Sequence, residues 1–250
     1  MKLKIDGKIY EGHKGETLME LARRNNIHIP SLCYKTGFEG LGRCRLCMVE
    51  VKENNRKRLV SACVYPIKEG IEVSTSTEEI EKIRKNIIML LLLRSPNNEY
   101  IKKLGEEYNV APPERYMDAS EVEDCILCGL CVKACEAMGR NAISFVQRGI
   151  TKKVSTPYDE PSMDCLGCEA CAEVCPTGAI KIEDRKDEKL IWYRGFGMVK
   201  CSVCGKELIQ ENILEFVNEK LNTEEEPICD ACKRKAVASK FKDSFQHILK

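Results

Sequence analysis

Sixteen of the 250 residues are cysteines, and the spacing of these cysteines constrains the chain more than any other feature of the sequence. They fall into four groups of four, and twelve of them recur as C-x2-C. A disulfide framework needs an oxidising compartment, whereas the opening residues MKLKIDGKIY lack the apolar core of a secretion signal. Buried structural thiols would be scattered rather than clustered. The spacing therefore predicts metal and iron–sulfur sites in a reducing, cytoplasmic environment.

Composition and charge argue against several other classes of protein. Hydrophobic residues make up 43% and charged residues 32%, which is typical of a folded chain. The 40 basic and 39 acidic residues leave a net charge of +1, so the overall charge does not favour nucleic acid as a partner. The longest apolar run, Ile87–Leu93, has seven residues, too few for a transmembrane helix. The sequence has no phosphate-binding loop or dinucleotide motif, and no catalytic residue is predicted.

The first cysteine group lies within a segment that has clear secondary-structure signals. Asp6–Gly7 is a two-residue hairpin signal, and Thr17 with Glu20 forms a capping box before a short helix. Strands are expected at residues 2–5, 8–11, 48–51 and 59–62, the last two around a polar turn at 52–58. This pattern predicts an α+β unit of the β-grasp kind, with the cysteines on loops at its edge.

The cysteines of this group are Cys33, Cys44, Cys47 and Cys63, in the pattern C-x10-C-x2-C-x15-C. Four thiolates are the ligand set of a [2Fe–2S] cluster, so these four are predicted to bind one. Gly40 and Gly42 precede Cys44, and glycine lets the backbone approach a cluster closely. The ten-residue gap differs from the four-residue gap of plant-type ferredoxins, which indicates a different subclass.

Two further groups repeat C-x2-C-x2-C-x3-C, the motif of bacterial ferredoxins that hold two [4Fe–4S] clusters. Because the fourth cysteine of each motif ligates the other cluster, the two ligand sets cross. Gly129 and Gly167 lie between ligands, where the chain must turn tightly. The first cluster is predicted to use Cys125, Cys128, Cys131 and Cys175, and the second Cys165, Cys168, Cys171 and Cys135.

Between these motifs and the first group, residues 76–108 are predicted to be helical. Ser76 and Glu79 match a capping box, and a second helix is expected near Tyr100–Tyr108. The first of these helices is expected to bury Ile80, Ile83, Ile87, Leu90 and Leu91. Beyond the first four-iron motif, Ala142–Val146 is predicted to be a strand, followed by a loop.

The last group consists of two C-x2-C pairs, Cys201/Cys204 and Cys229/Cys232, separated by 24 residues. Such pairs fit a four-cysteine zinc site of the zinc-ribbon kind. A third [4Fe–4S] cluster and a single rubredoxin-like iron are the alternatives. An amphipathic helix is expected at Ile209–Leu221, and Lys233–Lys250 is expected to be a basic solvated helix or a docking surface for a partner subunit.

Three stretches, Gly15–Leu18, Ile29–Cys33 and Gly42–Val51, resemble the N-terminal ferredoxin domain of the large iron–sulfur subunit of respiratory complex I. The same domain occurs in the diaphorase small subunit of NAD-reducing hydrogenases, in iron-only hydrogenases and in some formate dehydrogenases. The relatives hold an additional [4Fe–4S] cluster on one histidine and three cysteines. Leu93–Glu99 contains neither residue type, so that cluster is expected to be missing here.

The predicted organisation is a [2Fe–2S] ferredoxin domain (1–76), a helical linker (77–118), a two-[4Fe–4S] ferredoxin domain (119–186) and a four-cysteine module with a basic C-terminal helix (187–250). The resemblance implies a subunit of a soluble hetero-oligomeric complex that relays electrons from a flavin NAD(P)H dehydrogenase subunit to a catalytic subunit of the nickel–iron hydrogenase or formate dehydrogenase type. Such complexes can be electron-bifurcating and use soluble ferredoxin as well. Two alternatives stay open: a redox-sensing regulator that binds nucleic acid, and a free ferredoxin-like carrier.

Overall fold

A computed structural model describes residues 1–113, 123–224 and 226–245, with side chains as far as residue 242. The chain forms two compact units, each built from segments that are separated in the sequence. The first unit comprises Met1–Ala134, Gln147–Val154 and Cys171–Ile180, and the second comprises Cys135–Val146, Ser155–Ala170 and Lys181–Lys250. Each ferredoxin-type four-iron motif therefore contributes cysteines to both units.

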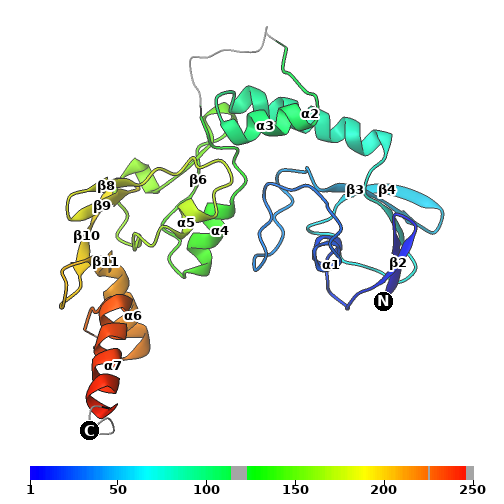
Figure 1. Ribbon diagram of the computed structural model, residues 1–250. Helices are drawn as coiled ribbons and strands as arrows, with labels where there is room; N and C mark the ends of the chain where they lie inside the picture. Colours follow the sequence, from blue (N-terminus) through cyan, green and yellow to red (C-terminus); the bar gives the residue numbers. More distant parts are fainter. Residues whose placement is uncertain (114–122, 225, 246–250) are drawn as a thin grey trace. The chain divides into compact units, whose positions relative to one another are not determined.

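The first unit begins with a five-stranded sheet of strand order β2-β1-β5-β3-β4 (Figure 1). The strands are β1 (Lys2–Ile5), β2 (Lys8–Glu11), β3 (Met48–Glu53), β4 (Arg56–Ser61) and β5 (Glu72–Ser74). β1 pairs parallel with β5, and the other neighbours are antiparallel. Helix α1 (Leu18–Arg24) packs Leu18 and Leu21 against Ile5 and Val49 of the sheet. Cys47 and Cys63 belong to the same buried core.

Several local predictions for this unit are confirmed, and one strand pair is longer than predicted. Asp6 and Gly7 close the β1–β2 hairpin with positive φ angles of 47° and 81°, and the capping box of α1 forms. β3 extends to Glu53 and β4 begins at Arg56, because Asn54 and Asn55 make a tight turn with φ angles of 49° and 62°. Residues near the tip of a hairpin are solvated on both faces, so both faces carry polar side chains there. The alternation of apolar and polar residues that predicts a strand is therefore missing.

Two helices, α2 (Glu78–Arg94) and α3 (Glu99–Glu107), pack against each other (Figure 1). Their apolar side chains share a buried cluster with Leu32 and Leu46. The predicted cap at Ser76 is wrong, because Thr77 accepts the hydrogen bond from the Ile80 N–H at 3.3 Å. The predicted apolar stripe is correct in part: Ile80 is buried, and Ile83, Ile87 and Leu91 are half-buried. The fully buried residues of α2 are Ile80, Arg84, Ile88 and Leu92, whereas Leu90 is 61% exposed.

The second unit contains a four-stranded antiparallel sheet of order β11-β10-β9-β8. Its strands are β8 (Glu183–Arg185), β9 (Glu188–Ile191), β10 (Arg194–Lys200) and β11 (Glu207–Gln210). Helix α6 (Glu211–Leu221) packs on β10 and β11, and α7 (Asp230–Phe245) follows. The helix predicted from Ile209 begins two residues later, because Ile209 pairs within the sheet. The end of the predicted basic helix, 246–250, lies outside the described residues.

Short elements carry the four-iron motifs or connect one motif to the other. They are the helices α4 (Leu130–Ala137) and α5 (Ala170–Glu173), the strands β6 (Ser144–Val146) and β7 (Lys153–Ser155), and the 3-10 turns Gly149–Thr151 and Pro157–Asp159. The strand predicted at Ala142 begins at Ser144, and β7 occupies part of the predicted loop. Among the described residues, no helix has the length and apolar character needed to cross a membrane.

Candidate cluster and metal sites

The four cysteines of the first group converge in the first unit from separate loops. Cys33 follows α1, Cys44 and Cys47 precede β3, and Cys63 follows β4. The sulfur atoms of Cys47 and Cys63 are 3.5 Å apart, and the thiol of Cys33 interacts with those of Cys44 and Cys63. Three of the four are buried, Cys44 being the partly exposed one. The structure therefore brings together all four predicted [2Fe–2S] ligands.

Hydrogen-bond donors surround these sulfur atoms. The Leu32 N–H donates to Cys44 Sγ, and the Cys44 N–H donates to Cys33 Sγ, both at 3.4 Å. Hydrogen bonds from the thiols of Cys44 and Cys63, together with bonds from backbone N–H groups, lower the pKa of Cys33 to about 2. Burial acts in the opposite direction but is outweighed. The pKa of Cys63 is raised in turn, because its thiol bonds to Cys33 and Cys47. Donors that favour anionic sulfur fit a thiolate-bound cluster.

Glycine is required at Gly40 by a close contact with the ligand loop. A Cβ atom built on Gly40 would lie 1.9 Å from the carbonyl oxygen of Cys63 and 3.0 Å from its Cβ. Gly42 has a φ of +59°, in the left-handed region that favours glycine. The close approach in the structure is thus between the Gly40 backbone and the backbone of a predicted ligand.

Arg84, a residue of α2 that no sequence motif indicated, holds the loop that carries Cys47. The Arg84 side chain is buried, and its guanidinium donates to the carbonyl oxygens of Leu46, Met48 and Thr75 at 3.2, 3.1 and 2.9 Å. Leu46 and Met48 flank Cys47. A single buried cation therefore fixes the backbone on both sides of a predicted ligand.

The first four-iron ligand set lies wholly within the first unit. Cys125 and Cys128 lie close enough to Cys175 for their charges to interact, and Cys131 interacts in the same way with Cys125 and Cys128. Burial raises the pKa of Cys128 to about 11 and that of Cys131 to about 12. Gly129 has a φ of +84°, as expected for a tight turn between ligands. Cys175 of the second motif thus lies with the first motif, as crossed ligation requires.

Cys175 has its own set of hydrogen-bond donors. Although burial acts against them, the side chain and backbone N–H of Thr177 and the N–H groups of Ala179 and Ile180 lower the pKa of Cys175. The hydroxyl of Thr177 lies 3.6 Å from Cys175 Sγ. This donor set, like that around Cys33, fits anionic sulfur bound to iron.

Residues from the end of α2 and the start of α3 hold the first four-iron ligand segments. Arg94 Nε donates to the Cys125 carbonyl oxygen at 2.7 Å and another guanidinium nitrogen to that of Lys152 at 3.3 Å. The amide of Asn98 donates to the Thr177 carbonyl oxygen at 2.8 Å. Both residues come from the stretch in which the sequence has neither histidine nor cysteine.

Three of the four predicted ligands of the second [4Fe–4S] cluster lie together in the second unit. The charge of Cys165 interacts with those of Cys135 and Cys168, and the Ala142 N–H donates to Cys135 Sγ at 3.2 Å. Burial raises the pKa of Cys165. The fourth predicted ligand, Cys171, belongs to the first unit.

The last cysteine group forms a compact cluster of thiols. Its members are Cys201, Cys204, Cys229 and Cys232. Their sulfur atoms all lie within 4.8 Å of one another. The Cys229 N–H donates to Cys201 Sγ and the Cys232 N–H to Cys229 Sγ, both at 3.4 Å. Bonds from backbone N–H groups, led by that of Cys229, lower the pKa of Cys201 to about 6, which favours the thiolate that binds metal. Because tetrahedral Zn–S bonds of about 2.3 Å place sulfur atoms about 3.8 Å apart, the four thiols fit one metal ion.

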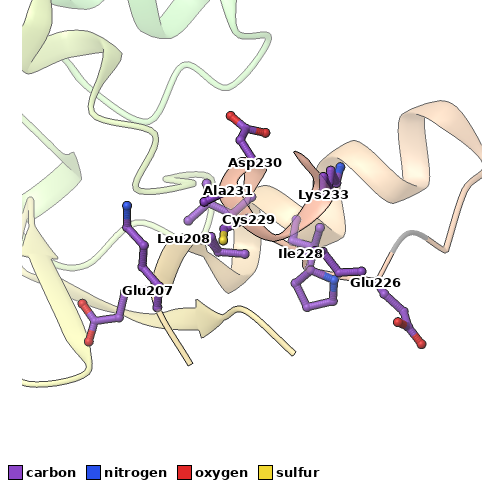
Figure 2. A pocket seen from close by; sticks show the side chains of 12 residues that line it. Glu207, Leu208, Glu226, Ile228, Cys229, Asp230, Ala231 and Lys233 are labelled. Carbon is purple, nitrogen blue, oxygen red and sulfur yellow. The ribbon is translucent and has the colours of Figure 1, made fainter. Parts of the chain in front are cut away.

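A cavity of about 480 Å³ opens beside this site. Figure 2 shows Cys229 close to Leu208 and Ala231, with the carboxylates of Glu207 and Asp230 directed outwards. Cys204 is exposed, whereas the other three cysteines are buried. The four-cysteine site is therefore bordered by solvent at Cys204 and by this cavity at Cys229.

Two family models match the chain. Residues 1–78 match a 2Fe-2S iron-sulfur cluster binding domain, and residues 124–179 match a 4Fe-4S dicluster domain. The two matches contain the first twelve cysteines of the chain, and the four-cysteine site lies beyond both.

The relatives are subunits of oxidoreductases. The alpha subunit of NADPH-Fe(3+) oxidoreductase from Geobacter sulfurreducens is 32% identical over 203 residues, which cover 72% of this chain and 24% of that protein. A subunit of NADH-quinone oxidoreductase from Rhizobium meliloti is 30% identical over 205 residues, with 72% and 24% covered. The gamma subunit of the NAD-reducing hydrogenase HoxS from Cupriavidus necator is 27% identical over 207 residues, with 72% and 86% covered. The chain thus spans about a quarter of the first two relatives and most of the third.

A solved structure supports the same relationship. A chain in the crystal structure of an NAD+-reducing [NiFe]-hydrogenase in the H2-reduced state matches with a TM-score of 0.58 and 25% identity, over 71% of this chain and 85% of that one. These comparisons fit the electron-transfer prediction rather than the redox-sensing one.

Proposed function

Because the chain carries 2Fe-2S and 4Fe-4S dicluster domains and is homologous to subunits of NADH-quinone oxidoreductases and of NAD-reducing hydrogenase, we propose that it relays electrons between two other subunits. One partner is a flavin NAD(P)H dehydrogenase subunit. The other is a catalytic subunit of the nickel–iron hydrogenase or formate dehydrogenase type. The chain itself supplies the conducting centres of this cytoplasmic hetero-oligomer, and soluble ferredoxin is a further candidate donor or acceptor.

The observation that carries this proposal is the contact between two predicted cluster sites. Cys33 and Cys128, ligands of the proposed [2Fe–2S] and first [4Fe–4S] clusters, lie in one buried group of side chains. Electrons can pass between centres that are held close together inside a protein. This arrangement supports a relay within the first unit.

The proposed ligand sets are those predicted from the motifs. They are Cys33, Cys44, Cys47 and Cys63 for [2Fe–2S], Cys125, Cys128, Cys131 and Cys175 for the first [4Fe–4S], and Cys165, Cys168, Cys171 and Cys135 for the second. When bound, the clusters accept and donate single electrons. The chain's own contribution is to hold the thiolates, to surround them with N–H donors and to bury them. The mixed sheet covered by α1 supports a β-grasp fold for residues 1–76.

For the last four cysteines we propose a zinc ion in a zinc-ribbon-like module at 187–250. The separation of the sulfur atoms, all within 4.8 Å, supports a single ion. A [4Fe–4S] cluster would hold its thiolates around a larger inorganic core. A single iron has the same tetrahedral sulfur coordination as zinc, so metal identity is the quantity to measure.

Metal analysis of the anaerobically purified chain tests these assignments. We expect about ten iron atoms and one zinc per chain. About fourteen iron atoms without zinc would instead assign a third [4Fe–4S] cluster, and about eleven would assign a single iron.

A second experiment tests the relay itself. The isolated chain should accept electrons from dithionite and pass them to a dye, but should not reduce the dye with NADH or NADPH. NADH-dependent reduction by the isolated chain would contradict the proposal. Co-purification of a flavoprotein and a catalytic subunit in equal amounts would decide against a free carrier.

A further inference from the structure

The C-terminal part of the chain, which neither family model covers, holds the ligand loop of the second four-iron motif. Arg194, the first residue of β10, directs one guanidinium nitrogen at this loop. That nitrogen donates to the carbonyl oxygens of Ser162, Met163 and Cys165, each at 3.0 Å. Cys165 is a proposed ligand, so the arginine fixes the loop at the ligand itself.

Phe196 supports the same loop from the same strand. Its ring is 1% exposed, and a Cβ atom built on Gly167 would lie 2.7 Å from a ring carbon. The guanidinium of Arg194 lies 5.0 Å from the ring centroid. Because residues two apart on a strand share a face, Arg194 and Phe196 act on the loop together. The ring occupies the space that Gly167 leaves between Cys165 and Cys168.

Glu169, which follows Cys168, connects the loop to two other strands. Its Oε1 atom accepts hydrogen bonds from Lys189 of β9 at 2.7 Å and from Gln210 of β11 at 2.6 Å. Gln210 is buried, and the carboxylate of Glu169 raises the pKa of Lys189. Three strands of the C-terminal sheet therefore each contribute a side chain to the loop.

Helix α6 contacts the segment that carries Cys135. The Arg140 N–H donates to the Cys135 carbonyl oxygen at 3.1 Å. The Arg140 guanidinium stacks over the ring of Phe216 from α6, 4.6 Å from its centroid. Both ligand segments that lie in the second unit are thus held by residues 187–250, the C-terminal module.

The four-cysteine site closes the far end of the hairpin that carries these contacts. Lys200 ends β10 directly before Cys201, and the Cys201 N–H donates to the Lys206 carbonyl oxygen at 2.8 Å. The same hairpin ends at Gln210, which bonds to Glu169. A metal bound by Cys201 and its three partners would tie this hairpin to the start of α7.

We propose that the C-terminal module is the structural support of the second [4Fe–4S] site. Arg194 is a positioning residue that holds the Cys165 loop, and the metal at the four-cysteine site keeps the β10–β11 hairpin in the arrangement that presents Arg194, Phe196 and Gln210. The inference rests on the ligand sets of the proposed function. It assigns to the module a role in retaining a cluster rather than in carrying electrons.

The first test uses the full chain with Arg194→Gln, purified anaerobically. The matched control is Arg185→Gln, an exposed arginine of β8 whose ion pairs join Glu183 and Glu188. We expect iron to fall from about ten to about six atoms per chain in Arg194→Gln and to stay at about ten in the control. The lost EPR signal should be the one that Cys168→Ser also removes, while the [2Fe–2S] signal remains. Full iron content and unchanged signals in Arg194→Gln would overturn the proposal.

The second test removes the C-terminal metal and serves if Arg194→Gln does not fold. Cys204→Ser changes the exposed cysteine of that site. We expect this variant to lack zinc and to lose the second [4Fe–4S] signal in air several times faster than the wild-type chain. A zinc-free variant that keeps both four-iron signals for the wild-type lifetime would overturn the proposal. A wild-type chain without about ten iron atoms contradicts the proposed function instead, so the two failures are distinguishable.

Discussion

Cys33 and Cys128 lie in one buried group of side chains, although they belong to cysteine groups that are proposed to bind different iron–sulfur clusters. Leu130 is part of the same group, and the partly buried Cys44 and Ile126 pack against it. Burial raises the pKa of Cys128, and the charge of Cys33 adds to that effect. The proposed [2Fe–2S] and first [4Fe–4S] sites are therefore neighbours in the first unit.

This contact predicts a magnetic interaction between the two clusters. When both are reduced, the EPR signal of the [2Fe–2S] cluster should broaden and relax faster than when it alone is reduced. In Cys128→Ser, which disturbs the first [4Fe–4S] site, the relaxation should become slow and independent of potential. The measurement is power saturation of the EPR signal at a series of potentials. Relaxation that does not depend on the state of the first [4Fe–4S] cluster would contradict the prediction.

Gly40→Ala is predicted to disrupt the [2Fe–2S] site. The new methyl group would lie 1.9 Å from the Cys63 carbonyl oxygen, so the ligand loop must move. Overpacking of this kind costs about 1–3 kcal/mol, and more when backbone must shift. We expect the variant to lose about two iron atoms and the [2Fe–2S] signal while keeping the four-iron signals. Glu39→Ala, at the exposed neighbouring position, is the control. A [2Fe–2S] signal of wild-type intensity in Gly40→Ala would show that the loop has room.

Arg84→Met is predicted to destabilise the first unit. The substitution keeps an unbranched apolar stem but removes the guanidinium. It therefore leaves the carbonyl oxygens of Leu46, Met48 and Thr75 without this donor and breaks the ion pair with Glu81. Each unpaired buried group costs about 1–3 kcal/mol, so the expected loss is about 3 kcal/mol or more. The check is a lowered midpoint of chemical unfolding under anaerobic conditions. Lys85→Met, at the next and exposed position of α2, should change the midpoint little. Equal midpoints for the two variants would refute the role of Arg84.

Even conservative substitutions of Asn98 are predicted to lower the stability of the first unit. The residue caps α3 by accepting from the Ile101 N–H at 3.3 Å, and it donates to the Thr177 carbonyl oxygen at 2.8 Å. Asn98→Ala loses these two bonds and a longer one of 3.4 Å to the Asp124 carboxylate, which we expect to cost about 2 kcal/mol. Asn98→Asp keeps the cap but directs a carboxylate at the Thr177 carbonyl, so it should not restore stability. Asn97→Ala is the exposed control, and thermal unfolding is the measurement. A stable Asn98→Asp variant would mean that capping alone matters.

Local features of the fold follow well from sequence because each depends on neighbouring residues. The Asp6–Gly7 turn needs positive φ angles, and the capping box of α1 joins Thr17 to a residue three positions away. The buried face of α2 was predicted only in part, because apolar spacing alone cannot reveal a buried cation. Ile80, Arg84 and Ile88 recur every four residues, and this spacing places Arg84 on the buried face. This four-residue periodicity is the one sequence pattern that could have predicted that Arg84 is buried.

The sequence by itself predicted the ligand sets of the sites, because thiolate ligands are recorded in residue type and in C-x2-C spacing. Tertiary structure decided what surrounds each site. It placed Cys33 beside Cys128, set Arg84 on the carbonyls around Cys47, and set Arg194 on the Cys165 loop. The acceptors in the last two cases are backbone carbonyl oxygens, which nearly every residue possesses. Because such acceptors carry no residue-specific signature, only the folded chain reveals which arginine reaches which loop.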